Sequence, residues 1–146
     1  MVEIIHRQSE RLSELVEDLL ELSRIDARQI QLEEKPVGVL EATQRAFEAV
    51  RPKASPRNTT LHVNVPASAQ VLGDKRAVEQ ILLNLVDNAV KYARPGGRVE
   101  VTAERRGDNL LIGVKDDGPG IEARHLPRVF ERFYRVDKGR SREKGG

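Results

Sequence analysis

The sequence contains no cysteine and no tryptophan, and its 146 residues include only three phenylalanines and two tyrosines. The absence of cysteine excludes disulfides and thiolate metal sites, and it is compatible with a reducing compartment. Aromatic residues make up 3% of the chain. A core built from so few aromatic side chains must be mainly aliphatic.

Long apolar runs and a charge of one dominant sign are also missing. No run approaches the roughly 18 apolar residues that a membrane span requires. The N-terminal segment "MVEIIHRQSE" is charged from its third residue, so no signal peptide is visible. Charged residues make up 33% of the chain, with both signs interspersed and a formal net charge of +2. Nucleic-acid binding favours a clustered basic face with stacking aromatics, so we expect a soluble chain without a nucleic-acid partner.

The first quarter of the chain predicts one long helix, from Val2 to about Leu32, because apolar residues recur at spacings of three and four. A heptad-like leucine seam runs along it at Leu12, Leu15, Leu19 and Leu22. A lone helix with such a seam must bury it, which indicates a helical bundle or a dimer. Pro36 then ends the helix.

The remainder predicts helices and strands in the order of an α+β sandwich. We expect a helix at about 41–53, strands at 60–66 and 69–74, a helix at about 75–93, a hairpin of strands 98–104 and 109–116, a glycine loop at 116–121 and a helical turn at 126–136. Asp74 is placed to cap the helix at 75–93. This helix is expected to bury Val78, Ile81, Leu82, Leu85 and Ala89.

The segment "NLVDNAVKYA" places Asn84, Asn88 and Lys91 at i, i+4 and i+7 of one helix, with Gln80 beside them. Asparagine is a poor interior helix former, by roughly 0.5 kcal/mol against alanine, so a functional role would explain the pair. Amide oxygens suit Mg²⁺ that is shared with substrate phosphates, and lysine supplies a charge for phosphate. A solvated polar face is the alternative explanation of this helix.

The segment "VKDDGPGI" follows a strand whose alternation puts Asp116 on the same face as Leu110, Ile112 and Val114. If that face is the core, Asp116 is aimed into an apolar pocket and needs a donor, such as the exocyclic amine of adenine. Gly118 and Gly120 remove side chains and let a flat ligand approach. An ordinary turn is the alternative.

The segment "VFERFYRVD" gathers Phe130, Phe133 and Tyr134, with Arg132 and Arg135 three residues apart. Apolar anchors can fix a loop while an arginine reaches a phosphate. A corner of the core would produce the same composition.

Taken together and in this order, the three segments resemble the N box, the first glycine box and the F box of sensor histidine kinases. The stretch "RLSELVEDLLELSRID" resembles the second helix of their dimerisation and phosphotransfer hairpin, and "VLGDKRAVEQILLNL" resembles their approach to the N box. The resemblance covers essentially the whole chain. It implies a long bundle helix (1–34) followed by an ATP-binding catalytic domain (35–146), a two-layer α/β sandwich of the histidine-kinase and gyrase type.

For the helix at 75–93, the resemblance implies contacts with ATP and Mg²⁺. Asn88 would hold the Mg²⁺ ion, and Asn84 would support it. Lys91 would contact the phosphates, and Tyr92 would pack by the adenine.

For the two later segments, the resemblance implies recognition of the base and of the terminal phosphate. Asp116 would accept a hydrogen bond from the adenine amine, while Gly118 and Gly120 would shape the pocket. Arg135 would approach the terminal phosphate. The tail "DKGRSREKGG" would begin the lid over ATP.

The sequence departs from the family at two places. The family's phosphorylated histidine lies on its first bundle helix and is followed by an acidic residue, a motif that is missing here. His6 falls within the apparent second helix, where we expect a surface histidine without an acidic partner to orient it, and His62 and His125 lie in no fitting motif. The sequence also ends before a second glycine box. We therefore expect a piece of a longer protein, cut within the lid, with no catalytic residue of its own and inactive alone.

The function that the resemblance implies is a protein-histidine kinase of two-component signal transduction. Its ATP-binding part would transfer the γ-phosphate to a histidine on a partner helix, for relay to a response-regulator aspartate. The resemblance also implies a homodimer through the helical bundle and a cytoplasmic location, with membrane attachment only through an upstream sensor region.

Two other functions compete with this one. ATP hydrolases of the same superfamily carry a glutamate one turn before the magnesium asparagine. That position is Asn84 here, and an amide cannot take a proton, which argues against hydrolysis. The remaining alternative is a non-catalytic dimerising or nucleotide-binding fragment.

Overall fold

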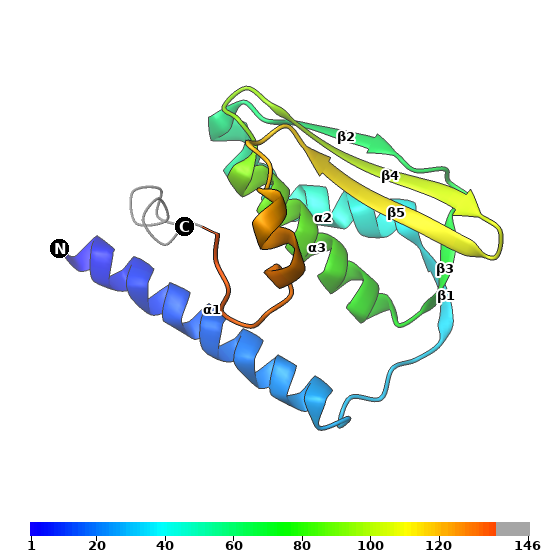
Figure 1. Ribbon diagram of the computed structural model, residues 1–146, viewed down its shortest axis with the longest axis horizontal. Coiled ribbons are helices and arrows are strands. Elements are labelled where there is room, and N and C mark those ends of the chain that lie inside the picture. Colours follow the sequence, from blue (N-terminus) through cyan, green and yellow to red (C-terminus); the bar gives the residue numbers. More distant parts are fainter. Residues whose placement is uncertain (137–146) are drawn as a thin grey trace. The chain divides into compact units, whose positions relative to one another are not determined.

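The computed structural model describes residues 1–136 and divides the chain into two units, Met1–Glu33 and a larger unit that begins at Glu34 (Figure 1). Each unit is described by itself. None of the helices in the described part of the chain combines the length and the apolar character that crossing a membrane requires.

Helix α1 (Val2–Asp26) ends earlier than Leu32, so its predicted end was wrong. Arg28 takes a left-handed conformation, with φ of 53°. The backbone N–H of Arg28 donates to the carbonyl of Ile25, and that of Gln29 donates to the carbonyl of Arg24, both at 3.0 Å. These two bonds form a Schellman cap. Glycine usually occupies the left-handed position of this cap, and because arginine stands there, the cap could not be predicted from the residue types.

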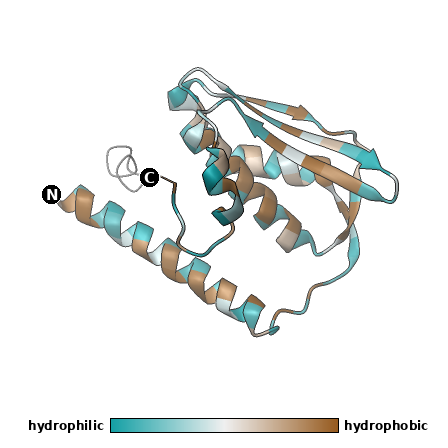
Figure 2. Ribbon diagram, viewed as in Figure 1, coloured by the Kyte–Doolittle hydropathy of each residue, from teal (hydrophilic) through white to brown (hydrophobic). Residues whose placement is uncertain are grey.

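The leucine seam of α1 lies on the surface of this chain. Among residues 2–26, all of which are described, none is buried. Leu12 is 63% exposed and Leu15 is 52% exposed. Figure 2 shows hydrophobic and hydrophilic residues alternating along this helix. The seam therefore has no partner within its own unit.

The second unit is a two-layer sandwich, as predicted. Helices α2 (Val39–Ala54) and α3 (Lys75–Tyr92) lie on one face of a sheet formed by β2 (Thr60–Asn64), β4 (Arg98–Arg106) and β5 (Asn109–Asp116) (Figure 1). The sheet order is β2–β4–β5. Strand β2 runs parallel to β4, and β4 pairs antiparallel with β5. The α+β class and the β4–β5 hairpin are both confirmed.

A second, two-stranded sheet pairs β1 (Lys35–Gly38) with β3 (Gln70–Gly73), antiparallel. Strand β3 was predicted, but β1 was not, because Pro36 was taken only as a break. A proline is tolerated in a strand whose N–H side is not needed for pairing, as at a sheet edge. The pairing partner of β1 lies far along the chain, so local pattern could not reveal it.

The described part of this unit also contains two short 3₁₀ helices, η1 (Ser55–Arg57) and η2 (Ala123–Arg128). The predicted helical turn at 126–136 overlaps η2 only at 126–128, and the rest of the predicted span is not helical, so its bounds were wrong. The predicted cap of α3 is confirmed, because Asp74 Oδ1 accepts from the backbone N–H of Ala77 at 3.0 Å.

The core is aliphatic apart from Phe47, as expected from the composition. Its fully buried aliphatic side chains come from α2, α3 and β4: Val39, Val50, Leu82, Val86, Val90, Val99 and Val101. Side chains of β5 pack against this cluster and are half-buried.

The buried face of α3 differs from the predicted one. Ile81 is 59% exposed and Leu85 is 47% exposed, whereas Val86 and Val90 are buried at 0% and 1%. Leu82 and Ala89 are buried as predicted, and Val78 is partly buried against the core. Apolar residues cover more than one side of this helix, and each residue turns by about 100° from the last. The sequence therefore allowed two buried faces, and packing against α2 and the sheet selected one.

This difference predicts unequal costs for two leucines on α3. Leu82→Ala should lower the free energy of unfolding by about 2–5 kcal/mol, because it leaves a cavity in the core. Leu85→Ala should lower it by less than about 1 kcal/mol, because its side chain is half in water. Urea denaturation of both variants measures the difference, and equal losses would contradict the assignment of the buried face.

Candidate functional site

One side of α3 carries a stripe of amide side chains. Gln80 Nε2 donates to Asn84 Oδ1 at 3.0 Å. Asn88 follows one turn later, and both asparagines are exposed. Asp87 lies on another face of the helix, where its Oδ1 accepts a hydrogen bond from Lys53 Nζ of α2 at 2.8 Å. The carboxylate thus joins the two helices, and the amide oxygens remain at the surface.

The last turn of α3 carries Lys91 and Tyr92. The Lys91 Nζ lies 5.5 Å from the centroid of the Tyr92 ring, within range of a cation–π interaction. The Tyr92 side chain is 55% exposed. Arg57 donates from Nη1 to the carbonyl of Lys91 at 2.9 Å and from Nη2 to the carbonyl of Ala93 at 2.7 Å. The helix end is therefore held by a side chain that the sequence did not single out.

Asp116 closes β5 and begins the glycine loop. Its Oδ1 accepts from the backbone N–H of Gly118 at 2.7 Å, an Asx-type turn. We predicted that Asp116 would be aimed into an apolar pocket, but it is exposed. The strand leaves the core after Val114, which is half-buried, and the next inward position is already at the surface.

The glycine loop lies directly against the end of α3. A Cβ atom on Gly118 would stand 2.4 Å from the carbonyl oxygen of Tyr92 and 2.8 Å from Asp116 Oδ1. No side chain fits at this position, so only glycine allows the two segments to meet. Gly120 has a φ of +76°, in the left-handed region that glycine adopts without strain. The structure therefore brings Tyr92, Asp116 and Gly118 together.

Asp117 ties the same loop to the turn that follows α3. Its Oδ1 accepts from the backbone N–H of Arg94 at 3.3 Å, and its Oδ2 accepts from that of Arg98 at 3.1 Å. The turn lies close enough that a Cβ on Gly97 would meet Asp117 Oδ1 at 2.4 Å. Asp117 was not among the predicted site residues, although the doubled aspartate in "DDGPGI" was a visible signal.

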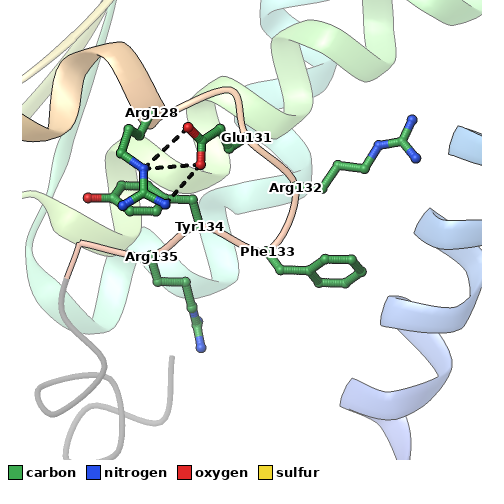
Figure 3. Close-up of a pocket in the computed structure, with 6 residues that line it drawn as sticks. All are labelled: Arg128, Glu131, Arg132, Phe133, Tyr134 and Arg135. Carbon is green, nitrogen blue, oxygen red and sulfur yellow. Dashed lines mark hydrogen bonds and ion pairs between the residues drawn. The ribbon is translucent and has the colours of Figure 1, made fainter.

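The segment after η2 is organised around Arg128 (Figure 3). Its guanidinium donates from Nη2 to Glu131 Oε2 at 3.0 Å, and its Cζ lies 4.2 Å from the centroid of the Tyr134 ring. The hydrogen bond to Glu131 raises the pKa of Arg128 above its usual value. Phe130 and Phe133 are 98% and 75% exposed. These aromatics do not form a corner of the core.

A hollow of about 340 Å³ lies in this segment, lined by Arg128, Glu131, Arg132, Phe133, Tyr134 and Arg135. Figure 3 shows Arg135 pointing away from the Arg128–Glu131 pair. Within the described residues, the hollow takes none of its lining from α3 or β5. It therefore does not unite Arg135 with Asn88 or Asp116. The expected lid at 137–146 lies outside the described residues.

Within the described residues, carboxylate and histidine side chains do not gather at a metal site. Among residues 1–136, no group of three or more His, Cys, Asp or Glu side chains could hold one. Mg²⁺ takes oxygen ligands, usually keeps several waters and often shares substrate phosphates. The exposed amide oxygens of α3 fit a cation held in that way.

His6 corrects one expectation about the histidines. We expected it to lack an acidic partner, but His6 Nε2 lies 3.1 Å from Glu10 Oε1, one helical turn along α1. The error arose because only the residue next in sequence was considered. Both side chains are largely exposed, at 74% and 63%, and such pairs contribute little in water.

A helix with a stripe of amides, set against a glycine loop on a two-layer sandwich, defines the class as an ATP-binding domain. Residues 73–146 match the family described as histidine kinase-, DNA gyrase B-, and HSP90-like ATPase. The chain belongs to this family, and its relatives in it are sensor histidine kinases.

Sensor-like histidine kinase SenX3 of Mycobacterium tuberculosis is 36% identical to the chain over 139 residues, which is 95% of this chain and 34% of SenX3. The chain thus spans about one third of the length of this relative. The relatives of this chain are protein-histidine kinases as a family.

Solved structures of other proteins share the fold. The mycobacterial sensor histidine kinase MprB is 36% identical, with a TM-score of 0.65 over 73% of this chain and 70% of that one. Full-length ShkA in complex with AMPPNP is 31% identical, with a TM-score of 0.77 over 87% of this chain and 28% of that one.

The contact between the glycine loop and α3 predicts a large effect of one methyl group. Gly118→Ala should destabilise the chain by about 1–3 kcal/mol, because its Cβ would overlap the carbonyl oxygen of Tyr92. Gly73→Ala is the matched control, since a Cβ there would meet Val78 Cγ2 at an ordinary 3.8 Å. Its effect should stay below about 1 kcal/mol. Urea denaturation compares the two, and a neutral Gly118→Ala would show that the loop does not pack as described.

Proposed function

We propose that this chain binds MgATP against the end of α3 and the glycine loop. It then transfers the γ-phosphate of the bound ATP to a histidine on a partner helix. The observation that carries the proposal is the contact of Gly118 with the Tyr92 carbonyl. This contact holds Asp116 beside the helix that bears Asn88 and Lys91. The sensor histidine kinases among the relatives support the same function.

The amide stripe is proposed to bind the metal and the phosphates. Asn88 holds Mg²⁺ through its amide oxygen, and Asn84, itself fixed by Gln80, supports it. The bound ion neutralises phosphate charge and orients the terminal phosphate. Lys91 adds a positive charge for the phosphates from the last turn of the helix.

The glycine loop is proposed to recognise the base. Asp116 accepts a hydrogen bond from the adenine amine with the carboxylate oxygen that Gly118 leaves available. Tyr92 packs by the ring from the end of α3. Gly120, with its left-handed backbone, lets the loop turn without a side chain in the ligand's path.

Arg135 is proposed to approach the terminal phosphate. A guanidinium presents planar, bidentate donors that suit phosphate. In the structure Arg135 lies in the separate hollow at 128–135, so reaching the phosphates requires this segment to close over the nucleotide.

Phosphoryl transfer to a protein group is favoured over hydrolysis by the side chain at position 84. A general base for water would have to accept a proton there, and the Asn84 amide cannot. Asp87, the nearest carboxylate along the helix, is paired with Lys53 on another face. The helix therefore offers metal ligands without a base for water.

The histidine that accepts the phosphate and the partner proteins are proposed to lie outside this chain. The exposed leucine seam of α1 is proposed to form part of a homodimeric bundle whose other helix carries the phosphorylated histidine. His6, although paired with Glu10, is proposed to be a surface histidine of that bundle. A response-regulator aspartate is proposed as the final acceptor, and any membrane attachment comes through an upstream sensor region.

The metal role predicts that MgATP binding depends on Asn88. Asn88→Ala should weaken binding about tenfold, or ~1.4 kcal/mol, through loss of a metal ligand. Without Mg²⁺, the variant and the unchanged chain should bind ATP alike. Titration calorimetry measures both conditions. Asp87→Ala is the matched control, one residue away but facing Lys53, and should keep the affinity within about twofold. Equal MgATP affinities in the Asn88 variant and the unchanged chain would remove Asn88 from the site.

The activity predicts label transfer from γ-labelled MgATP to a supplied partner helix that carries a histidine followed by an acidic residue. The chain alone should remain unlabelled, because His6 is not the acceptor. Gel analysis before and after acid treatment detects the labelled band and its loss in acid, since phosphohistidine is acid-labile. An acid-labile band on the chain itself that vanished in His6→Gln would instead make His6 the acceptor. A chain that bound MgATP but labelled no helix would be a non-catalytic nucleotide-binding module.

A further inference from the structure

Arg57 binds the end of α3 from outside the sequence segments that mark the site. It closes η1, and its side chain is half-buried. Two separate nitrogens of its guanidinium reach the carbonyls of Lys91 and Ala93, at 2.9 and 2.7 Å. The last carbonyls of a helix lack intrahelical donors, and a cation at this end also meets the negative pole of the helix. Arg57 therefore satisfies both needs of the helix terminus at once.

The backbone of Arg57 holds the turn that follows the helix. Its carbonyl accepts from the backbone N–H of Gly96 at 2.8 Å. Three residues further along the chain, the backbone N–H of Thr60 donates to the carbonyl of Gly97 at 2.9 Å. Asp117 binds the same turn from the side of the glycine loop. The turn is thus fixed between Arg57 and the loop after β5.

The residues that Arg57 fixes are those on which the nucleotide site depends. Its first bond ends on the carbonyl of Lys91, and its second ends on the residue after Tyr92. The carbonyl of Tyr92 itself is the atom against which Gly118 packs. A shift of this helix end would therefore move Lys91 and Tyr92 relative to Asp116.

We propose that Arg57 is a positioning residue of the nucleotide site, which sets the last turn of α3 against the glycine loop without touching the ligand. The inference rests on the proposed function, because it assumes that MgATP binds between these two segments. Arginine is required because its planar fork reaches two carbonyls, whereas a lysine ammonium is a single point of charge.

The test compares Arg57→Met and Arg57→Lys with the unchanged 146-residue chain, at a temperature where circular dichroism shows each fully folded. Titration calorimetry gives the MgATP affinity. Hydrogen exchange followed by nuclear magnetic resonance gives local order at the Ala93 and Gly96 amides, with the Val101 amide of β4 as an internal reference.

Arg57→Met should weaken MgATP binding by roughly tenfold, the size typical of losing a residue that orients a ligand-binding group. Exchange at Ala93 and Gly96 should accelerate while Val101 keeps its rate. Arg57→Lys retains the charge at the helix end, so its remaining loss of affinity measures the two-bond geometry. If Arg57→Met does not fold, Arg57→Lys decides the question by the same two measurements.

Arg45→Met is the matched control. Arg45, in α2, also reaches α3, through Nη1 to Glu79 Oε1 at 3.0 Å, but near the opposite end of α3. It should keep the MgATP affinity within about twofold. Faster exchange with unchanged affinity in the Arg57 variants would make Arg57 merely structural and overturn the inference. Failure of the unchanged chain to bind MgATP would overturn the proposed function itself, and the inference with it.

Discussion

The contact between the Tyr92 carbonyl and the backbone of Gly118 is the constraint on which the site depends. Two segments that are far apart in sequence meet there, at a separation that leaves no room for a Cβ atom. One segment ends a helix with amide side chains, and the other follows a strand that ends in a carboxylate. The contact itself joins backbone to backbone, while the side chains of Arg57 and Asp117 hold the chain on either side of it. The aliphatic core beneath fixes both elements and so determines where the contact falls.

The chemistry of the site follows from what stands on each face of α3. The carboxylate of Asp87 is engaged by Lys53, while the exposed face offers the amides of Asn84 and Asn88. Amide oxygens can bind a hard cation and cannot accept a proton, so this face suits metal-assisted phosphoryl transfer better than activation of water. The ion pair of Asp87 and the exposed amides thus lie on different faces of the same helix.

Helix α1 differs from the second unit in the burial of its apolar residues. Its seam is apolar, yet no residue of Val2–Asp26 is buried within the described chain. Exposed apolar surface of this kind is favourable only when another surface covers it. The second unit has its own buried core, whereas α1 buries none of its apolar residues within the described chain.

Local sequence determined the features that depend on local chemistry. The cap at Asp74, the hairpin of β4 and β5, the aliphatic core and the positions of the two site segments could all be predicted, because each follows from periodicity, turn residues or composition. The face of α3 was decided by tertiary packing, since apolar residues cover more than one side of that helix. The pairing of β1 with β3, the exposure of Asp116 and the bonds from Arg57 to the end of α3 were decided in the same way. Each of these joins residues that are distant in sequence, and no local pattern records which distant backbone a side chain will meet.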